Sequence, residues 1–377
     1  MLNAISNRSD YPCLLQTNYL NQASLGLIGQ AAVSQMHEFL DKIARHGNLK
    51  MSDEEEASFA DPLRKKASQL LNCPVENLAI VSSASEILSQ LPQLFAIKSG
   101  SKILVISSDF PAITRPWIAY SQKTDCELKF IDEHANENLT EQIVQNIDKN
   151  TAAVCVSHVQ FSTGTQLDIK KIRQVASKFG ARLVIDVTQA AGAVPISAND
   201  WQADILVCSG YKWLGGHGGV ALAVISSELL KELPPSPGWF GGDNPFDMTA
   251  TLLPLSKTAK RYTQATMSYI SIVGLTASIS ELLEIGVPKI FSHSQEMSKL
   301  LKDGLTNSQW TTHRPTQDKS VSSHIITLVN ESSDISQTVQ NLKEQKIFCG
   351  VRNGRLRISL AHYNDESDIN ALLSVLS

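Results

Sequence analysis

Short apolar runs that alternate with helix-like stretches are the feature that most constrains the fold of this 377-residue chain. Several runs are continuously apolar and rich in valine and isoleucine, as expected for parallel strands that are buried on both faces. The runs are 77–83, 101–108, 126–132, 151–158, 181–187, 204–210 and 218–226. Helix-like segments such as 168–180, which Gly180 is expected to end, lie between them. This alternation predicts a doubly wound α/β domain, whose ligands bind at the carboxyl ends of the strands.

The pattern changes after about residue 230. A segment rich in proline and glycine, 233–246, predicts a loop, and a long helix is expected over 268–286. Two further strands and a final helix capped by Asp365 are expected at 323–329, 354–360 and 365–376. We therefore predict a large α/β domain of residues 20–255 and a smaller α+β domain of residues 1–19 and 256–377.

The composition excludes several classes of protein. Hydrophobic residues make up 42% and charged residues 19% of the chain, and the net charge is −4, which does not suggest a nucleic-acid or membrane-surface partner. The six cysteines include no C-x-x-C pair, so neither a metal site nor a disulfide scaffold is expected. The N-terminus lacks the features of a signal peptide, and no apolar run approaches the roughly 18 residues of a transmembrane helix. We expect a cytoplasmic protein.

An acid and a lysine follow two of the predicted strands. Asp186 ends a very apolar run, where an unpaired carboxylate is costly, and Lys212 follows the next run at the same edge of the sheet. Each residue alone would be interpreted as an ordinary surface side chain of a loop. Together they fit pyridoxal phosphate, because a carboxylate keeps its pyridine nitrogen protonated and a lysine holds its aldehyde as a Schiff base.

The motif around these two residues resembles a known family. The run VIDVTQAAGAVPI…ADILVCSGYKWLGGHGG is similar to the class V aminotransferases, which include cysteine desulfurases, kynureninase and isopenicillin-epimerase-like proteins. The likeness extends from YLNQASLG at 19–26 to LRISLAHYNDESDI at 356–369. It implies a fold-type-I transferase that binds pyridoxal 5′-phosphate. The implied architecture is a large, mostly parallel, seven-stranded sheet domain with a smaller α+β domain.

The resemblance also implies roles for residues that hold the cofactor. Lys212 matches the Schiff-base lysine, and Asp186 matches the acid on the pyridine nitrogen. Gln189 matches a position beside the cofactor's phenolic oxygen, and Phe110 matches an aromatic residue that stacks on the ring. A phenylalanine of the protein core is the alternative interpretation of Phe110.

Other positions match the family's phosphate site. Ala84 and Ser85 open a predicted helix whose backbone amides would bind the phosphate. Ser209 and Tyr211 match further phosphate contacts, with a phenol where many relatives have histidine. Thr266 matches a residue that reaches the phosphate of the other subunit, which implies a homodimer with shared active sites.

The substrate site is expected around Arg357, which matches the arginine that binds the substrate carboxylate through its planar fork. Because Arg352 and Arg355 lie nearby, the register of this match stays open. The family's usual asparagine aligns with Phe161, so His158 or Gln160 is expected to line the site instead. Contact of His217 with the substrate is a further hypothesis.

The cofactor alone does not fix the reaction. Lys212 is the natural acid and base for the α-proton, a step common to transamination, racemisation and β-elimination. Cysteine desulfurases carry their reactive cysteine on a loop, whereas Cys349 lies in a strand-like run, eight residues before Arg357. We therefore predict an amino-acid aminotransferase, with a lyase, desulfurase or epimerase as the first alternative. An inactive binding protein is the second alternative, and the joint presence of the site residues argues against it.

Overall fold

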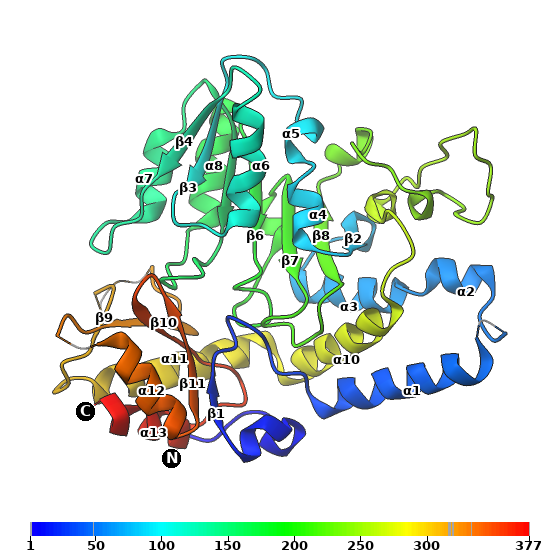
Figure 1. Cartoon of the computed structure of the whole chain (residues 1–377). Helices are drawn as coiled ribbons and strands as arrows, with labels where there is room; N and C mark the ends of the chain where they lie inside the picture. Colours follow the sequence, from blue (N-terminus) through cyan, green and yellow to red (C-terminus); the bar gives the residue numbers. More distant parts are fainter. Residues whose placement is uncertain (1, 48, 316–317, 319, 333, 377) are drawn as a thin grey trace.

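The computed structural model describes residues 2–47, 49–315, 318, 320–332 and 334–376 (Figure 1). In this part of the chain, two β-sheets of seven and five strands organise the fold. The larger sheet lies in the upper half of Figure 1 and the smaller one at the lower left.

The larger sheet has the strand order β2-β8-β7-β6-β5-β3-β4. Its strands are β2 (Leu78–Val81), β3 (Lys102–Ile106), β4 (Glu127–Ile131), β5 (Thr151–Ser157), β6 (Arg182–Asp186), β7 (Ile205–Ser209) and β8 (Ala221–Ile225). The pairs from β7 through β4 are parallel, and β8 is antiparallel to both β7 and β2. The seven strands predicted from the apolar runs and the mostly parallel sheet are confirmed.

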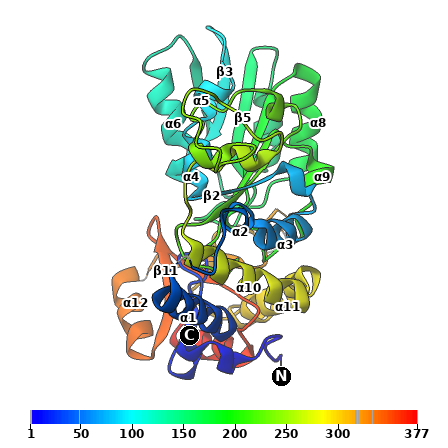
Figure 2. The same ribbon diagram turned by 90° about the vertical axis from the view of Figure 1, so that its right-hand side faces the viewer.

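Helices cover both faces of this sheet because successive side chains of a strand point to opposite sides. On β3, Ile103 and Val105 face one layer, whereas Leu104 and Ile106 face the other. The first layer holds α4 (Ala84–Leu88), α5 (Leu91–Leu94) and α6 (Pro111–Ser121). The second holds α3 (Asp61–Leu71), α7 (Leu139–Asn146), α8 (Ile169–Phe179), α9 (Ala198–Trp201) and α10 (Tyr269–Ile285). Figure 2 shows α6 and α8 on opposite sides of the sheet.

The helix ends follow their capping residues. The Asp168 side chain accepts a hydrogen bond from the backbone N–H three residues later, which starts α8. Gly180 ends α8 in the left-handed conformation (φ 70°), which glycine adopts without a steric penalty. Gly286 ends α10 with a positive φ of 89°, outside the left-handed helical region. The predicted limits of both helices are confirmed.

The smaller sheet has the strand order β1-β11-β12-β10-β9. Its strands are β1 (Asn18–Leu20), β9 (Thr311–Thr312), β10 (Ile325–Val329), β11 (Ile347–Arg352) and β12 (Arg355–Ser359). The helices near it are α11 (Val287–Gly304), α12 (Ile335–Glu344) and α13 (Glu366–Leu376). Leu20 packs in the apolar cluster of this sheet. The expected division into two domains, with boundaries at residues 19/20 and 255/256, stays a prediction.

Two long helices run side by side below the larger sheet, as Figures 1 and 2 show. They are α10 and α1 (Gln30–His46), and the short α2 (Asp53–Ser58) follows α1. Among the described residues, no single helix has both the length and the apolar composition needed to cross a membrane. In the described part of the chain, one pair of helices, α10 and α11, passes that test together, and the two bend by 73° at their junction.

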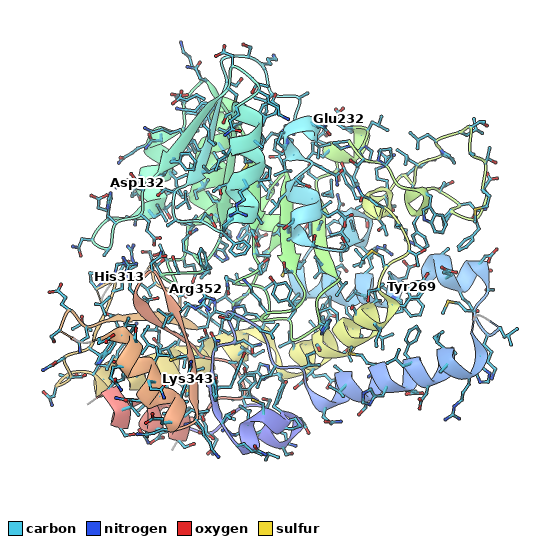
Figure 3. All side chains as sticks on the ribbon, in the orientation of Figure 1. Asp132, Glu232, Tyr269, His313, Lys343 and Arg352 are labelled. Carbon is cyan, nitrogen blue, oxygen red and sulfur yellow. The ribbon has the colours of Figure 1, made fainter. Side chains whose placement is uncertain are left out.

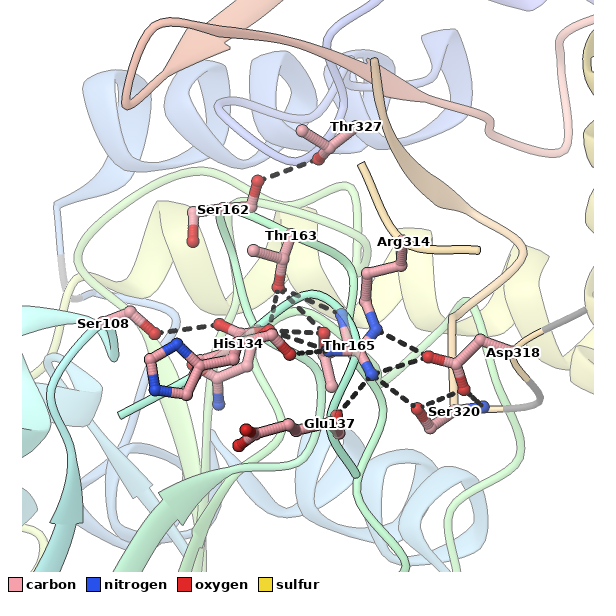
Figure 4. A network of polar contacts seen from close by, with 12 residues as sticks. Ser108, His134, Glu137, Ser162, Thr163, Thr165, Arg314, Asp318, Ser320 and Thr327 are labelled. Atoms are coloured by element: carbon pink, nitrogen blue, oxygen red, sulfur yellow. Dashed lines mark hydrogen bonds and ion pairs between the residues drawn. The ribbon is translucent and has the colours of Figure 1, made fainter. Parts of the chain in front are cut away.

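A buried polar network joins the segment before β10 to loops of the larger sheet (Figure 4). The Arg314 and Glu133 side chains are only 3% and 2% exposed, and Arg314 Nη1 lies 3.8 Å from Glu133 Oε1. Arg314 also donates to the carbonyl oxygens of His134 and Glu137. The Thr163 hydroxyl donates to Glu133 at 2.7 Å. Each charge in this network is hydrogen-bonded as well as paired, and the network links the segment before β10 to loops of the larger sheet.

Candidate active site

A pocket with about 530 Å³ of empty space lies at the carboxyl ends of the central strands. Its lining residues are Ser83, Ala84, Ser85, Phe110, Ala112, Ser157, Phe161, Asp186, Thr188, Gln189, Ser209, Tyr211 and Lys212. Ser157, Asp186 and Ser209 are the last residues of β5, β6 and β7. Ligands of parallel α/β sheets bind at this edge.

The structure brings together most of the residues predicted from the sequence. Eight of them line the pocket, namely Ala84, Ser85, Phe110, Asp186, Gln189, Ser209, Tyr211 and Lys212. Arg357 lies directly behind the pocket wall, because its Nη1 donates to the carbonyl oxygen of Phe161 at 2.7 Å. Thr266 is exposed and His217 is an exposed loop residue, and neither belongs to the pocket lining.

The substrate role predicted for His158 has no support in this geometry. Adjacent side chains at the end of β5 point to opposite sides, so Ser157 faces the pocket and His158 faces the core. The His158 ring packs edge-on against Trp201, with 4.7 Å between ring centroids. Burial lowers the pKa of His158 to about 3, so the ring stays neutral. Gln160 is also fully buried, and its amide donates to Asp109 and to the Ser157 carbonyl.

Lys212 is buried with an exposed fraction of 7%, and its Nζ lies 5.2 Å from the centroid of the Phe110 ring. Burial lowers the pKa of Lys212 to about 8, because the ammonium form loses its hydration. Asp186 opposes this shift, whereas the positive charges of Arg357 and Arg352 add to it. About a tenth of Lys212 is therefore a neutral amine at pH 7, the form that attacks an aldehyde.

The N-terminal NQASLG segment holds the backbone of Lys212 in place. Gly26 donates to the Tyr211 carbonyl at 2.9 Å, and the Gln22 amide donates to the Lys212 carbonyl at 3.0 Å. A methyl group on Gly26 would lie 2.1 Å from the Lys212 carbonyl oxygen, so only glycine allows this approach. The segment matched at 19–26 thus packs directly against the lysine.

Asp186 supplies a buried carboxyl group to the same pocket. Its exposed fraction is 5%, and its Oδ1 accepts a hydrogen bond from the Thr188 N–H at 2.7 Å. Burial raises the pKa of Asp186, and the hydrogen bonds from Thr188 oppose that shift. A carboxylate in this position is stabilised by a cationic partner, and a protonated pyridine nitrogen would supply one. The pair Asp186 and Lys212 therefore fits pyridoxal phosphate.

One end of the pocket offers donors for an anion. Helix α4 begins at Ala84, so the backbone N–H groups of Ala84 and Ser85 belong to its first turn, where N–H groups lack partners within the helix. Ser209 and Tyr211 line the same pocket, and burial raises the pKa of the Tyr211 phenol, which therefore remains a hydrogen-bond donor. These groups could hold the cofactor's phosphate.

The Gln189 amide is fixed at both ends. Its nitrogen donates to the Ala23 carbonyl at 3.0 Å, and its oxygen accepts from the Trp213 indole at 2.8 Å. The predicted contact of Gln189 with the phenolic oxygen of the cofactor stays a prediction.

Asp109, which was not predicted from the sequence, sets the positions of two pocket residues. Its carboxylate accepts hydrogen bonds from the Phe110 N–H at 2.6 Å and from the Ser157 N–H and hydroxyl at 2.7 and 2.6 Å. Burial raises the pKa of Asp109 to about 6. Asp109 could have been predicted as a site residue, because it is an acid just after an apolar run, as Asp186 is an acid at the end of one.

Ser83, Ala112, Ser157 and Thr188 were also missed. The Thr188 hydroxyl accepts from the Ser209 N–H at 3.0 Å and so joins the ends of β6 and β7. Thr188 lies within the matched VIDVTQAAG motif and Ser157 ends β5, whereas no role in the pocket was predicted for Ser83 or for Ala112 in α6.

Cys349 lies within β11 and not on a loop. Burial raises the pKa of its thiol to about 12, so the reactive thiolate is scarce at neutral pH. This placement agrees with the interpretation of Cys349 as a packed thiol and not a mobile nucleophile.

The chain is similar to known proteins over nearly its whole length. The family model described as aminotransferase class-V matches residues 18–372. An uncharacterized aminotransferase of Bacillus subtilis, YcbU, is 26% identical over 96% of this chain and 94% of its own length. A kynureninase of Bacillus cereus is 24% identical over 96% and 87% of the two chains. A probable cysteine desulfurase of Pyrococcus abyssi is 23% identical over 98% and 96%.

Solved structures share the fold. One structure of C-DES, described as having glycine covalently linked to its PLP cofactor, superposes with a TM-score of 0.89 at 20% identity, covering 98% of this chain and 99% of the other. The apo structure of a cysteine desulfurase from Thermococcus onnurineus NA1 gives a TM-score of 0.86 at 21% identity, covering 98% and 96%.

Proposed function

The chain belongs to the class V aminotransferase family of pyridoxal-phosphate enzymes, and on that premise we propose that it transaminates an amino acid. The observation that carries the proposal is the buried pair Asp186 and Lys212 in one pocket. When bound, pyridoxal phosphate supplies an aldehyde that captures amines and a ring that accepts electrons from the substrate's α-carbon. The role of each residue below belongs to the proposal.

Lys212 Nζ is the group that carries the α-proton. As a neutral amine with a pKa near 8 it can accept a proton, and in its ammonium form it can return one. The Phe110 ring beside it provides an apolar face on which a planar ring can stack. Asp186 holds a proton on the pyridine nitrogen through its negative charge.

The remaining site residues orient the cofactor and the substrate. We assign the phosphate to the first turn of α4, at Ala84 and Ser85, and to the hydroxyls of Ser209 and Tyr211. Arg357 would bind the substrate α-carboxylate, since its planar guanidinium suits a pair of oxygens. Its position behind Phe161 supports this role.

Transamination is favoured over desulfuration by the placement of Cys349. A persulfide mechanism needs a thiolate on a segment that reaches the substrate, whereas Cys349 is a protonated thiol within a strand. The relatives are named as an aminotransferase, a kynureninase and a cysteine desulfurase. Transamination would be contradicted if the enzyme formed the products of a lyase or an epimerase.

The visible absorption spectrum of the protein, before and after addition of single L-amino acids, tests the proposal. We expect a band from lysine-bound pyridoxal phosphate, and we expect one class of amino acid to convert it to the pyridoxamine form. Because transamination leaves the amino group on the cofactor, this change should occur in a single turnover without a keto acid. A persistent band with accumulating pyruvate, alanine or sulfide would instead support a lyase. A protein that takes up no cofactor would support the inactive binding protein.

We further propose a cytoplasmic homodimer in which Thr266 reaches the partner's phosphate site. Thr266 is exposed and lies outside its own pocket, as such a role requires. The nearby loop exposes apolar side chains, with exposed fractions of 45% for Trp239, 68% for Leu252 and 54% for Leu253. Exposed apolar surface of this kind marks interfaces. The cytoplasmic location is supported by the sequence features alone.

Light scattering after size exclusion is expected to give twice the 41.2 kDa mass of one chain. Replacing Leu252 and Leu253 together by aspartate should produce monomers, because the change places charges in the apolar interface. Phe179→Asp is the matched control, since Phe179 is 44% exposed at the end of α8 and should leave the dimer intact. A fully active wild-type monomer would contradict the shared site.

A further inference from the structure

Two arginines converge on one serine hydroxyl beside the pocket. Arg352 Nη2 donates to Ser24 Oγ at 3.0 Å, and Arg357 Nη2 donates to the same oxygen at 2.6 Å. The Ser24 hydroxyl in turn donates to Asn21 Oδ1 at 2.8 Å. Each hydrogen-bonding direction of this hydroxyl is therefore used, and Ser24 holds the two guanidinium groups side by side. Figure 3 places Arg352 between the two sheets.

Neither guanidinium has a carboxylate partner among the residues that the structure describes. Arg357 is fully buried, and its Nε has no hydrogen-bond partner there. Burial, followed by repulsion from Arg352, lowers the pKa of Arg357 to about 9. Both arginines also lower the pKa of Lys212, so both positive charges act on the pocket. A buried unpaired cation is costly, and an anionic ligand would remove this cost.

We propose that Arg352 binds a second acidic group of the substrate, so that the enzyme acts on amino acids with an acidic side chain. This inference rests on the proposed function, in which Arg357 binds the α-carboxylate. A substrate with one carboxylate would neutralise only one of the two guanidinium groups. A dicarboxylic amino acid balances both charges.

The positions of the two arginines decide which group each one binds. Arg357 lies within β12 and is fixed by the Phe161 carbonyl at the pocket wall, near the reacting amine. Arg352 is the last residue of β11 and is only partly buried, next to the exposed turn at Asn353 and Gly354. The α-carboxylate lies one bond from the reacting carbon, so it suits the inner arginine. The side chain of the substrate extends away from that carbon and reaches the outer arginine.

The strand pairing gives Arg357 the space that this arrangement needs. Gly350 lies opposite Arg357 across the β11–β12 pair. A methyl group on Gly350 would lie 3.2 Å from Arg357 Nη2 and 3.3 Å from its Nε, closer than most side-chain contacts. Because Gly350 has no side chain, it does not crowd the Arg357 Nε, which has no hydrogen-bond partner in the described structure.

The test compares the dissociation constants of glutarate and butyrate, measured by calorimetry on the cofactor-loaded protein. We expect Arg352→Gln to weaken glutarate binding by roughly 10- to 100-fold, the effect of losing a charge-assisted hydrogen bond. Butyrate binding should change by less than about threefold, because it has no second carboxylate. Arg352→Lys should restore part of the glutarate affinity, since it keeps the charge. In turnover, kcat/KM should fall for acidic amino acids and not for neutral ones.

Arg355→Gln is the matched control, because Arg355 pairs with Arg352 across the two strands and makes no hydrogen bond to Ser24 in the described structure. Equal weakening of glutarate and butyrate by Arg352→Gln would mean that both arginines share one carboxylate, which overturns the inference. Unchanged glutarate affinity overturns it as well. A wild-type protein without a cofactor band would contradict the proposed function instead. In that case the same titration on the cofactor-free protein still tests the role of Arg352, because the arginines need no cofactor to bind glutarate.

Discussion

Lys212→Ala is expected to abolish turnover, with a loss of at least about 10⁴-fold in kcat. The variant loses both the amine that captures the cofactor's aldehyde and the base that moves the α-proton. Its visible spectrum should lack the band of lysine-bound cofactor, and any pyridoxal phosphate that stays with the protein should be held noncovalently. The measurements are the absorption spectrum, after removal of unbound cofactor, and the rate of product formation from the preferred amino acid.

Lys102→Ala is the matched control for this variant. Lys102 is also a buried lysine, with an exposed fraction of 8%, but it lies at the start of β3 and its Nζ bonds to Asp148 at 2.8 Å. Its removal should lower the melting temperature and leave the cofactor band in place. A Lys212→Ala protein with an unchanged band and normal turnover would contradict the assignment of the lysine.

Asp186→Ala is expected to reduce kcat by about 10²- to 10³-fold, the effect of removing one fixed electrostatic contact to the reacting group. Without the carboxylate, the pyridine nitrogen loses the charge that keeps it protonated, so the ring withdraws electrons less strongly. Cofactor should still attach to Lys212. The variant should therefore keep a visible band, with slow loss of the α-proton measured by hydrogen–deuterium exchange of the substrate.

Asp204→Asn separates this electrostatic effect from a general loss of stability. Asp204 is a buried acid at the other end of β7, where it pairs with Arg173 at 3.0 Å and Arg182 at 2.6 Å. Its replacement should lower stability and spare kcat. If Asp186→Ala and Asp204→Asn slowed exchange of the α-proton equally, the proposed contact of Asp186 with the pyridine nitrogen would be untenable.

The sequence by itself determined the larger sheet. Strands buried on both faces must be continuously apolar, so their composition marks them without any knowledge of their neighbours. The same reasoning located Asp186 and Lys212, because charged residues are conspicuous at the ends of apolar strands. Parallel strands present their carboxyl ends at one edge, which is why residues far apart in the sequence could be expected in one pocket. The apolar pattern and the strand ends thus predicted the fold class and the centre of the site.

Only the tertiary structure decided which side chains face the pocket. Ser157 and His158 are adjacent in the sequence and equally polar, and the direction of the strand end alone sends one to the pocket and the other to the core. Arg352 and Arg357 meet Ser24, more than 300 residues earlier in the chain, because β1 pairs with β11 and β11 pairs with β12. No local sequence pattern predicts this contact between the two arginines and Ser24. It depends on the register of strands that pack only when the whole chain has folded.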